Sequence, residues 1–309
     1  MKIITWNIRG FNSPLKQNGV INLMKKNKVD IFCILETKLS SENLEKLMNK
    51  KFSTWRQANN FEQHSAGRIL VLWNSQKVQS QILGSKDQVI HCKVTCSVTS
   101  KCFAVSFVYG FNSIVARSPL WQELIDFSQI SDPWLIIVDF NCVLSPDEKQ
   151  NGVPVTAYGV KDINDCFCEA GLMDLNSSGC LLTWSKGNVR YKLDRALVNH
   201  KWLISGYNAH TEFQFPRVYS DHSSCIVSLF EDVNCGRRPF KFFNIWVNHE
   251  NFREEINRAW DLNIRGFSQF RLMKKLQALK QPLRNLNSLH FSHISSRAEH
   301  AMEEVVEAQ

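Results

Sequence analysis

Two nearly unbroken apolar runs constrain the fold of this chain more than any other feature of its sequence. One covers residues 29–35 and stops at Glu36, and the other covers residues 134–138 and stops at Asp139. Such runs form strands that are buried on both faces, because a half-exposed strand would alternate polar and apolar residues. Both strands must therefore lie inside a layered protein, and each is followed by a carboxylate.

Further strand patterns outnumber the helical ones. Strands are predicted at 2–8, 68–73, 89–94, 102–109, 181–184, 191–198, 210–215 and 225–230, and helices at 16–28, 40–47, 119–127 and 158–170. Helices that recur between buried strands cover the outer faces of sheets. We therefore predict an α/β (α+β) fold, a four-layered α/β/β/α sandwich of two mixed sheets with outer helices, followed by a C-terminal helical extension.

The composition shifts near residues 231–236, which favours a domain of residues 1–232 and an extension of residues 233–309. Within the extension the leucines follow a four-three spacing, at Leu272, Leu276, Leu279, Leu283 and Leu286. One interpretation is a coiled-coil seam, and the other is a helical segment that packs on a partner. Pro282 argues against one straight helix.

Composition and charge narrow the class of protein. A hydrophobic content of 44% in 309 residues supports a real core, and a net charge of +8 with a pI near 9.0 favours an anionic partner such as nucleic acid. The ten cysteines show neither paired zinc spacing nor a disulfide framework. Without a signal peptide or an apolar run of membrane-spanning length, we expect a nuclear or cytoplasmic protein that is not secreted and has no membrane partner.

Residues with ligand or proton-transfer chemistry stand at the ends of the predicted strands. They are Asn7, Glu36, Tyr109, Asp139 with Asn141, Asp194, and Asp221 with His222. Strand ends on one side of a sandwich form a natural binding site, and hard oxygen ligands select Mg²⁺ or Mn²⁺ over zinc. The set predicts metal-assisted attack of water on a phosphodiester.

Each of these residues also has a purely structural interpretation. Strand-end turns explain Asn7, Glu36 or the Asp221–His222 pair taken singly, and a core tyrosine explains Tyr109. Asp194 beside Arg195 fits a surface ion pair worth at most about 1 kcal/mol. Asp139 and Asn141 are harder to explain in this way, because unpaired charge after a buried strand is costly. The occurrence of all these residues together at strand ends favours a functional site.

In this order, the clusters resemble the signature of the endonuclease/exonuclease/phosphatase superfamily. The matching segments are Trp6-Asn7-Ile8-Arg9-Gly10, Leu35-Glu36-Thr37-Lys38, Val108-Tyr109-Gly110, Asp139-Phe140-Asn141, Leu193-Asp194-Arg195 and Ser220-Asp221-His222. The closer similarity is to the apurinic-endonuclease-like domain of plant LINE-type (non-LTR) retrotransposons. It is carried by Gly67-Arg68-Ile69-Leu70-Val71-Leu72-Trp73, Gly171-Leu172-Met173-Asp174-Leu175, Leu182-Thr183-Trp184-Ser185 and Phe215-Pro216-Arg217.

The resemblance implies catalytic roles for the strand-end residues. Asp139, helped by Asn141, would orient and deprotonate the attacking water. His222 would donate a hydrogen bond to the scissile phosphate, Asp194 would hold the imidazole, and Tyr109 would contact phosphate.

The resemblance also implies a metal side and a set of DNA contacts. Glu36 would coordinate Mg²⁺, or alternatively Mn²⁺, with Asn7 close by and Asp221 completing the metal side. No small-molecule cofactor is expected. The basic residues predicted to contact phosphate or DNA are Arg9, Lys38, Lys186 and Arg195.

Two positions depart from the family pattern. Val138 stands where a glycine usually precedes the Asp-Phe-Asn segment, and its branched side chain could crowd the site. Lys186 stands where many relatives have asparagine, which keeps affinity for phosphate but could alter cleavage preference.

Three functions follow from these observations. The first is a Mg²⁺-dependent DNA endonuclease that nicks one strand to a 3′-hydroxyl and a 5′-phosphate. The second is a catalytically inactive nucleic-acid-binding remnant, and the third, ranked last, is an inositol or lipid phosphatase. Residues 238–246 and the leucines after them resemble the connector that leads to reverse transcriptase. Because no polymerase follows, we expect a truncated element or a gene fragment derived from one.

Overall fold

The computed structural model describes residues 1–63, 68–215, 219–230, 242, 244–266 and 268–291. In it the chain divides into two units, Met1–Asp232 and Val233–Gln309. Some residues of the sequence motifs lie outside the described part of the chain. These are Gly67, Pro216, Arg217 and residues 238–241 and 243 of the connector motif.

The larger sheet of the first unit is mixed. Its strands are β1 (Lys2–Asn7), β2 (Ile31–Leu35), β3 (Trp55–Asn59), β4 (Ile69–Asn74), β11 (Ser177–Gly179), β15 (Ala209–Phe213) and β16 (Cys225–Leu229), in the order β11-β15-β16-β1-β2-β4-β3. β1 and β2 run parallel, whereas β16 and β4 pair antiparallel with β1 and β2 respectively. The C-terminal ends of β1 and β2 therefore lie at the same edge as the start of β4.

A second mixed sheet contains β5 (Val78–Lys86), β6 (Val89–Cys96), β7 (Cys102–Tyr109), β8 (Trp134–Asp139), β10 (Met173–Asp174) and β14 (Asp194–Val198), in the order β10-β14-β8-β7-β6-β5. β7 and β8 run parallel, and β14 pairs antiparallel with β8 so that Asp194 lies opposite Asp139. A small third sheet joins β9 (Lys149–Gln150), β12 (Trp184–Lys186) and β13 (Val189–Tyr191).

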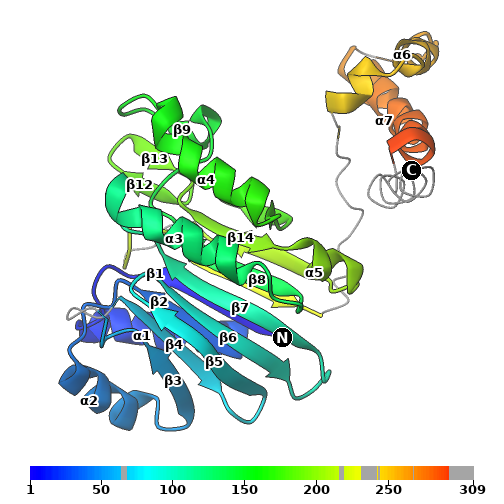
Figure 1. Cartoon of the computed structure of the whole chain (residues 1–309). Coiled ribbons are helices and arrows are strands. Elements are labelled where there is room, and N and C mark those ends of the chain that lie inside the picture. Colours follow the sequence, from blue (N-terminus) through cyan, green and yellow to red (C-terminus); the bar gives the residue numbers. More distant parts are fainter. Residues whose placement is uncertain (64–67, 216–218, 231–241, 243, 267, 292–309) are drawn as a thin grey trace, which may run out of the picture. The chain divides into compact units, whose positions relative to one another are not determined.

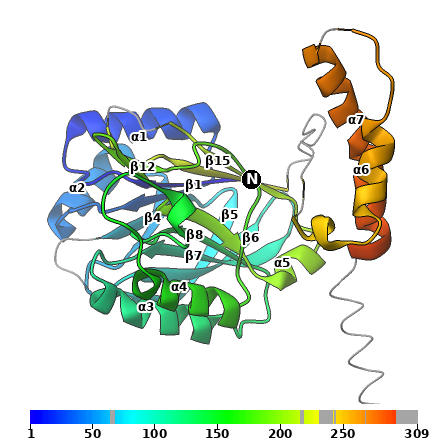
Figure 2. The ribbon, with the colours of Figure 1, turned by 90° about the horizontal axis from the view of Figure 1, so that it is seen from above.

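Alternating side chains of the strands build three apolar layers. On β2, Cys33 belongs to the core between the sheets, whereas its neighbours Phe32 and Ile34 pack under α1 (Pro14–Asn27) and α2 (Ser41–Lys51). On the second sheet, α3 (Ile114–Phe127) and α4 (Ala157–Glu169) cover the outer face. Figures 1 and 2 show the two helix pairs on opposite sides of the two sheets. The predicted four-layered sandwich is confirmed.

Predictions of element bounds failed where helix capping or the pairing of short strands determines the local structure. α3 begins at Ile114 rather than at Pro119, because the hydroxyl of Ser113 caps the helix by accepting from the Ala116 amide. The predicted strand 191–198 divides into β13 and β14. β5 was not predicted, and Gly84 lies inside it beside a register shift in its pairing with β6.

The second unit contains the predicted helices. α6 spans Phe252–Trp260, α7 spans Ser268–Leu286, and short turns lie at Asn244–Asn248 and Asn287–Phe291. α7 continues through Pro282, so the proline does not end the helix. Trp246 packs with Leu279, Leu283 and Leu286, while Leu272 and Leu276 are exposed. Only part of the leucine series is therefore buried within the unit. Among the described residues, no helix combines the length and the apolar character needed to cross a membrane.

Candidate active site

Side chains from the two sheets meet at the edge where β1, β2, β7 and β8 end. Asn7 ends β1, and its amide Nδ2 donates to Oδ2 of Asp139 at the end of β8 (2.8 Å). Tyr109 ends β7, and its hydroxyl donates to Oε1 of Glu36, which follows β2. Parallel pairing within each sheet places these ends together, so two hydrogen bonds join the sheets at one edge.

Asp139 is fully buried and held from both sides. Its Oδ1 accepts a hydrogen bond from the backbone amide of Asn141 (3.0 Å), while Oδ2 accepts from Asn7. Burial raises the pKa of Asp139 to about 7, although the nearby His222 imidazole and these hydrogen bonds oppose the rise. A carboxylate with this pKa can exchange a proton near neutral pH.

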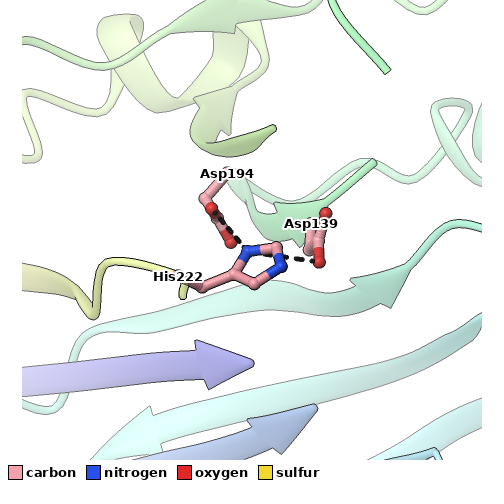
Figure 3. A group of neighbouring side chains, drawn as sticks. All are labelled: Asp139, Asp194 and His222. Atoms are coloured by element: carbon pink, nitrogen blue, oxygen red, sulfur yellow. Dashed lines mark hydrogen bonds and ion pairs between the residues drawn. The ribbon is translucent and has the colours of Figure 1, made fainter. Parts of the chain in front are cut away.

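His222 lies between two carboxylates, as Figure 3 shows. Its Nδ1 is 3.1 Å from Oδ2 of Asp194 and 3.6 Å from Oδ2 of Asp139. Burial lowers the pKa of this imidazole, but the two carboxylates outweigh it and raise the pKa to about 9. The ring is therefore a cation at neutral pH and can act as a hydrogen-bond donor.

The loop that carries His222 is fixed by residues for which the sequence predicted no role. The Ser220 hydroxyl donates to the carbonyl of Asn7 (2.6 Å) and accepts from the His222 amide (3.1 Å). The Trp6 indole donates to the His222 carbonyl (3.0 Å). Opposite, the Thr183 hydroxyl accepts from the Asp194 amide (2.9 Å). The Ser-Asp-His and Thr-Trp segments were noted in the sequence, but only contacts across the fold reveal these supporting roles.

Near this cluster, two carboxylate oxygens have no hydrogen-bond partner in the part of the chain that the structure describes. They are Oε2 of Glu36 and Oδ1 of Asp221, both buried. Glu36 has a left-handed backbone with φ of 50°, and Nε of Arg9 and Nζ of Lys38 lie 3.8 and 3.7 Å from its Oε2. Buried carboxylate oxygens without donors fit a divalent cation, which prefers hard oxygen ligands.

Asp221 remains ionised in this surrounding. Its Oδ2 accepts from Nη1 of Arg9 (2.6 Å) and from the indole of Trp184 (3.0 Å). Burial opposes ionisation, but the hydrogen bond from Arg9, the His222 charge and the Trp184 contact together lower the pKa of Asp221.

Asp139, Asp194 and His222 also lie close enough together to hold a metal, with ligand atoms within 4.8 Å of one another. In the structure, however, the His222 Nδ1 already faces Oδ2 of Asp194 at 3.1 Å. Within the described ranges, the buried carboxylate oxygens without a donor are those of Glu36 and Asp221.

Asn141 acts mainly through its backbone and through the loop it stabilises. It has φ of 52°, and its Nδ2 donates to the carbonyl of Gly110 (2.8 Å). Arg117 is buried and donates to the carbonyls of Phe111 and Asn141 (2.5 and 3.1 Å). The loops after β7 and β8 are thereby fastened to each other, which orients Asp139 through the Asn141 amide. No sequence pattern pointed to Arg117.

The four basic residues predicted to contact phosphate or DNA differ in their exposure to solvent. The side chains of Arg9 and Lys38 are 48% and 57% exposed beside Glu36, and Lys186 is exposed at the end of β12. Arg195 contradicts the prediction. Its guanidinium is fully buried and donates to Asp174 (2.7 Å) and to Glu148, so it cannot reach DNA in this structure. The interpretation of Asp194 and Arg195 as a surface ion pair is also wrong, because both are buried.

An α/β/β/α sandwich with a carboxylate–imidazole cluster at its strand ends defines a class of hydrolases. The sequence model of the Endonuclease/Exonuclease/phosphatase family matches residues 4–222, which is most of the chain. The chain belongs to this family, whose members are hydrolytic nucleases and phosphatases that generally use a divalent metal. The predicted superfamily is confirmed, whereas the plant LINE origin and the connector stay predictions.

Solved structures of varied activity share the fold. The endonuclease domain of TRAS1, a telomere-specific non-LTR retrotransposon, superposes with a TM-score of 0.57 at 11% identity, over 75% of this chain and 99% of that domain. Humanized D. rerio TDP2 gives 0.55 at 12% identity, over 75% and 99%. A mannosyl-6-phosphatase of Bacteroides thetaiotaomicron gives 0.52 at 14% identity, over 75% and 100%. At these identities the likeness is one of fold.

Proposed function

We propose that residues 1–232 form a Mg²⁺-dependent DNA endonuclease, with Mn²⁺ as the alternative ion, which nicks one strand to a 3′-hydroxyl and a 5′-phosphate. The observation that carries the proposal is the pairing of buried Asp139 with the cationic imidazole of His222. A base and a charged donor side by side suit attack on an anionic phosphodiester. The basic surplus of the chain supports a nucleic-acid substrate.

In this mechanism Asp139 accepts the proton of the attacking water. Asn7 and the Asn141 amide hold the carboxylate in place, and burial keeps its pKa near the working pH. His222 donates to a phosphoryl oxygen, and Asp194 orients the ring. Arg9 and Lys38 add positive charge beside the phosphate.

Glu36 and Asp221 would hold the divalent ion through their undonated oxygens. When bound, the ion would polarise a phosphoryl oxygen and so favour attack by water. The Tyr109 hydroxyl fixes the Glu36 carboxylate by donating to Oε1, and burial and the Glu36 charge raise the Tyr109 pKa, so the phenol stays protonated.

The inactive-remnant hypothesis rested partly on Val138, and the packing of that residue weakens it. Val138 is buried in the layer under α3 and α4, so its side chain points away from the catalytic cluster. The neighbouring Asp139 keeps both of its hydrogen bonds. The motivations that remain are the expected truncation of the element and Lys186, which is exposed. A phosphatase activity has support only in the shared fold.

Relaxation of supercoiled plasmid tests the proposal. The wild type should convert the plasmid to the nicked form only with Mg²⁺ or Mn²⁺, and DNA ligase should reseal the nicks, because sealing requires a 3′-hydroxyl beside a 5′-phosphate. Asp139→Asn and His222→Ala should abolish nicking, whereas Lys46→Gln, on the exposed face of α2, should not. Equal nicking by all four proteins would contradict the assignment of the site. Metal-independent DNA binding without nicking would favour the inactive remnant.

We further propose that the nuclease acts in the nucleus, with the cytoplasm as the alternative location. We also propose that residues 233–309 derive from the connector of a LINE-type element. Support comes from the connector-like sequence at 238–246 and the separate helical unit. A reverse-transcriptase reading frame, intact or decayed, next to the gene would support this origin. Unrelated flanking sequence at every genomic copy would contradict it.

A further inference from the structure

The row of functional strand ends continues one strand beyond Glu36. In the larger sheet the neighbouring strands β16, β1, β2 and β4 bring His222, Asn7, Glu36 and then Arg68 to the same edge. Arg68 directly precedes β4, in which Ile69 pairs with Leu35, and its carbonyl accepts from the Thr37 amide (3.4 Å). Neighbouring strands are about 4.8 Å apart, so the Arg68 backbone lies one strand from that of Glu36.

The guanidinium of Arg68 reaches towards the other sheet. Its Cζ lies 4.6 Å from the ring centroid of Phe111 and 5.5 Å from that of Tyr109, both within the range of cation–π attraction. Tyr109 is the last residue of β7, and Phe111 follows it after Gly110. Because Tyr109 donates to Glu36, Arg68 places a positive charge beside a residue that already belongs to the site.

Stacking on aromatic rings gives the guanidinium a defined orientation. An arginine held in this way keeps its charge at any relevant pH and presents a planar fork that matches two oxygens of a phosphate. Arg68 is half-buried, so part of the residue is exposed to solvent. In the row of strand ends, Asn7 and His222 lie on the far side of Glu36, and Asp139 of the second sheet bonds to Asn7. A nucleic-acid backbone laid along this row would therefore bring the phosphate that flanks the scissile one towards Arg68.

We propose that Arg68 is a positioning residue that binds the backbone phosphate flanking the scissile one, on the Glu36 side of the site. The inference rests on the proposed nuclease function and adds a substrate contact to it. The competing explanation is that Arg68 only packs on Tyr109 and Phe111 and stabilises the two loops. A packing role would affect stability, whereas a phosphate contact would affect the salt dependence of DNA binding.

Binding of the full chain to a fluorescent DNA duplex in EDTA, measured over a range of salt concentrations, separates these roles. Loss of one phosphate contact should reduce the slope of log K against log salt by about 0.9. We expect this change for Arg68→Met and not for Arg68→Lys, which keeps the charge. The matched control is Arg56→Met, because Arg56 is exposed on β3 and pairs with Trp73 at the opposite end of β4. In nicking assays Arg68→Met should raise KM several-fold and leave kcat nearly unchanged.

A second measurement does not require Arg68→Met to fold. Neutral methylphosphonate replaces each phosphate around the nick in turn, and one flanking position should weaken binding of the wild type several-fold. Arg68→Lys should show the same pattern, and Arg68→Met, where folded, should be insensitive at that position. Equal slopes for wild type and Arg68→Met, or no sensitive flanking phosphate in the wild type, would overturn the inference alone. Absence of DNA binding by the wild type would overturn the inference and the proposed function together.

Discussion

The amide Nδ2 of Asn7 donates a 2.8 Å hydrogen bond to Oδ2 of Asp139, and both residues are buried. The two residues are 132 positions apart in the chain and end strands of different sheets. The bond therefore couples the packing of the two sheets to the orientation of the proposed base.

Asn7→Ala should impair both stability and catalysis. It leaves Oδ2 of the buried Asp139 without its amide donor, which costs about 1–3 kcal/mol of unfolding free energy. Misplacement of the base should lower kcat about 100-fold. Urea unfolding and plasmid nicking measure the two effects. Asn18→Ala, on the exposed face of α1, is the control and should change neither, and retention of full kcat by Asn7→Ala would contradict the positioning role.

The pH profile of nicking should be bell-shaped. Activity requires Asp139 deprotonated and His222 protonated, so the rate should rise as the pH passes about 7 and fall as it passes about 9. Asp194→Asn removes an anion that raises the His222 pKa, so the falling limb should move to lower pH. Initial rates across buffers of constant ionic strength test both limbs. A falling limb at the same pH in Asp194→Asn would exclude His222 as its origin.

Metal binding should stabilise the folded protein through Glu36. A ligand at about 100 times its Kd adds about 2.7 kcal/mol to the free energy of unfolding. The thermal midpoint of the wild type should therefore rise with Mg²⁺ or Mn²⁺, and much less so for Glu36→Gln, which weakens a ligand oxygen. Glu42→Gln, exposed on α2, should behave like the wild type. Equal shifts for Glu36→Gln and the wild type would place the ion elsewhere.

The layers could be predicted from sequence because apolar runs and helical periodicity are local signals. Residues 29–35 and 134–138 predicted the buried strands β2 and β8. The carboxylates that follow them bond to other strand ends, Glu36 to Tyr109 and Asp139 to Asn7. β5 escaped prediction because it is an edge strand with an irregular burial pattern and a register shift at Gly84.

The site was predictable only in part. Strand ends identified Asn7, Asp139 and His222, but exposure is a property of the whole fold. The sequence could not show that Arg195 is buried against Glu148, or that Arg68 stacks on Phe111, since these partners lie far apart in the chain. Cation contacts of this kind depend on loop packing rather than on residue spacing.

Gly110→Ala should disturb the loops that hold Asp139. A Cβ at this position would lie 2.6 Å from the Phe140 carbonyl oxygen, and the Gly110 amide donates to the Asp139 carbonyl (2.8 Å). Overpacking of this kind costs about 1–3 kcal/mol, and nicking should fall with it. Gly84→Ala is the matched control, because its Cβ would lie 3.7 Å from the nearest side chain, which is ordinary contact. Unchanged unfolding and nicking by Gly110→Ala would show that the loops can separate without loss.

Arg195 and Lys186 should separate stability from DNA affinity. Arg195→Met removes the buried partner of Glu148, which keeps Lys192 at 3.4 Å, so the fold should lose about 1–3 kcal/mol of unfolding free energy. The salt dependence of DNA binding should stay unchanged in the folded fraction, because Arg195 does not reach the surface. Lys186→Met should show the opposite result, with unaltered urea unfolding and a salt slope reduced by about 0.9. A guanidinium held by Asp174 and Glu148 inside the fold cannot release counterions from a duplex. A reduced salt slope for Arg195→Met would therefore contradict its exclusion from DNA binding.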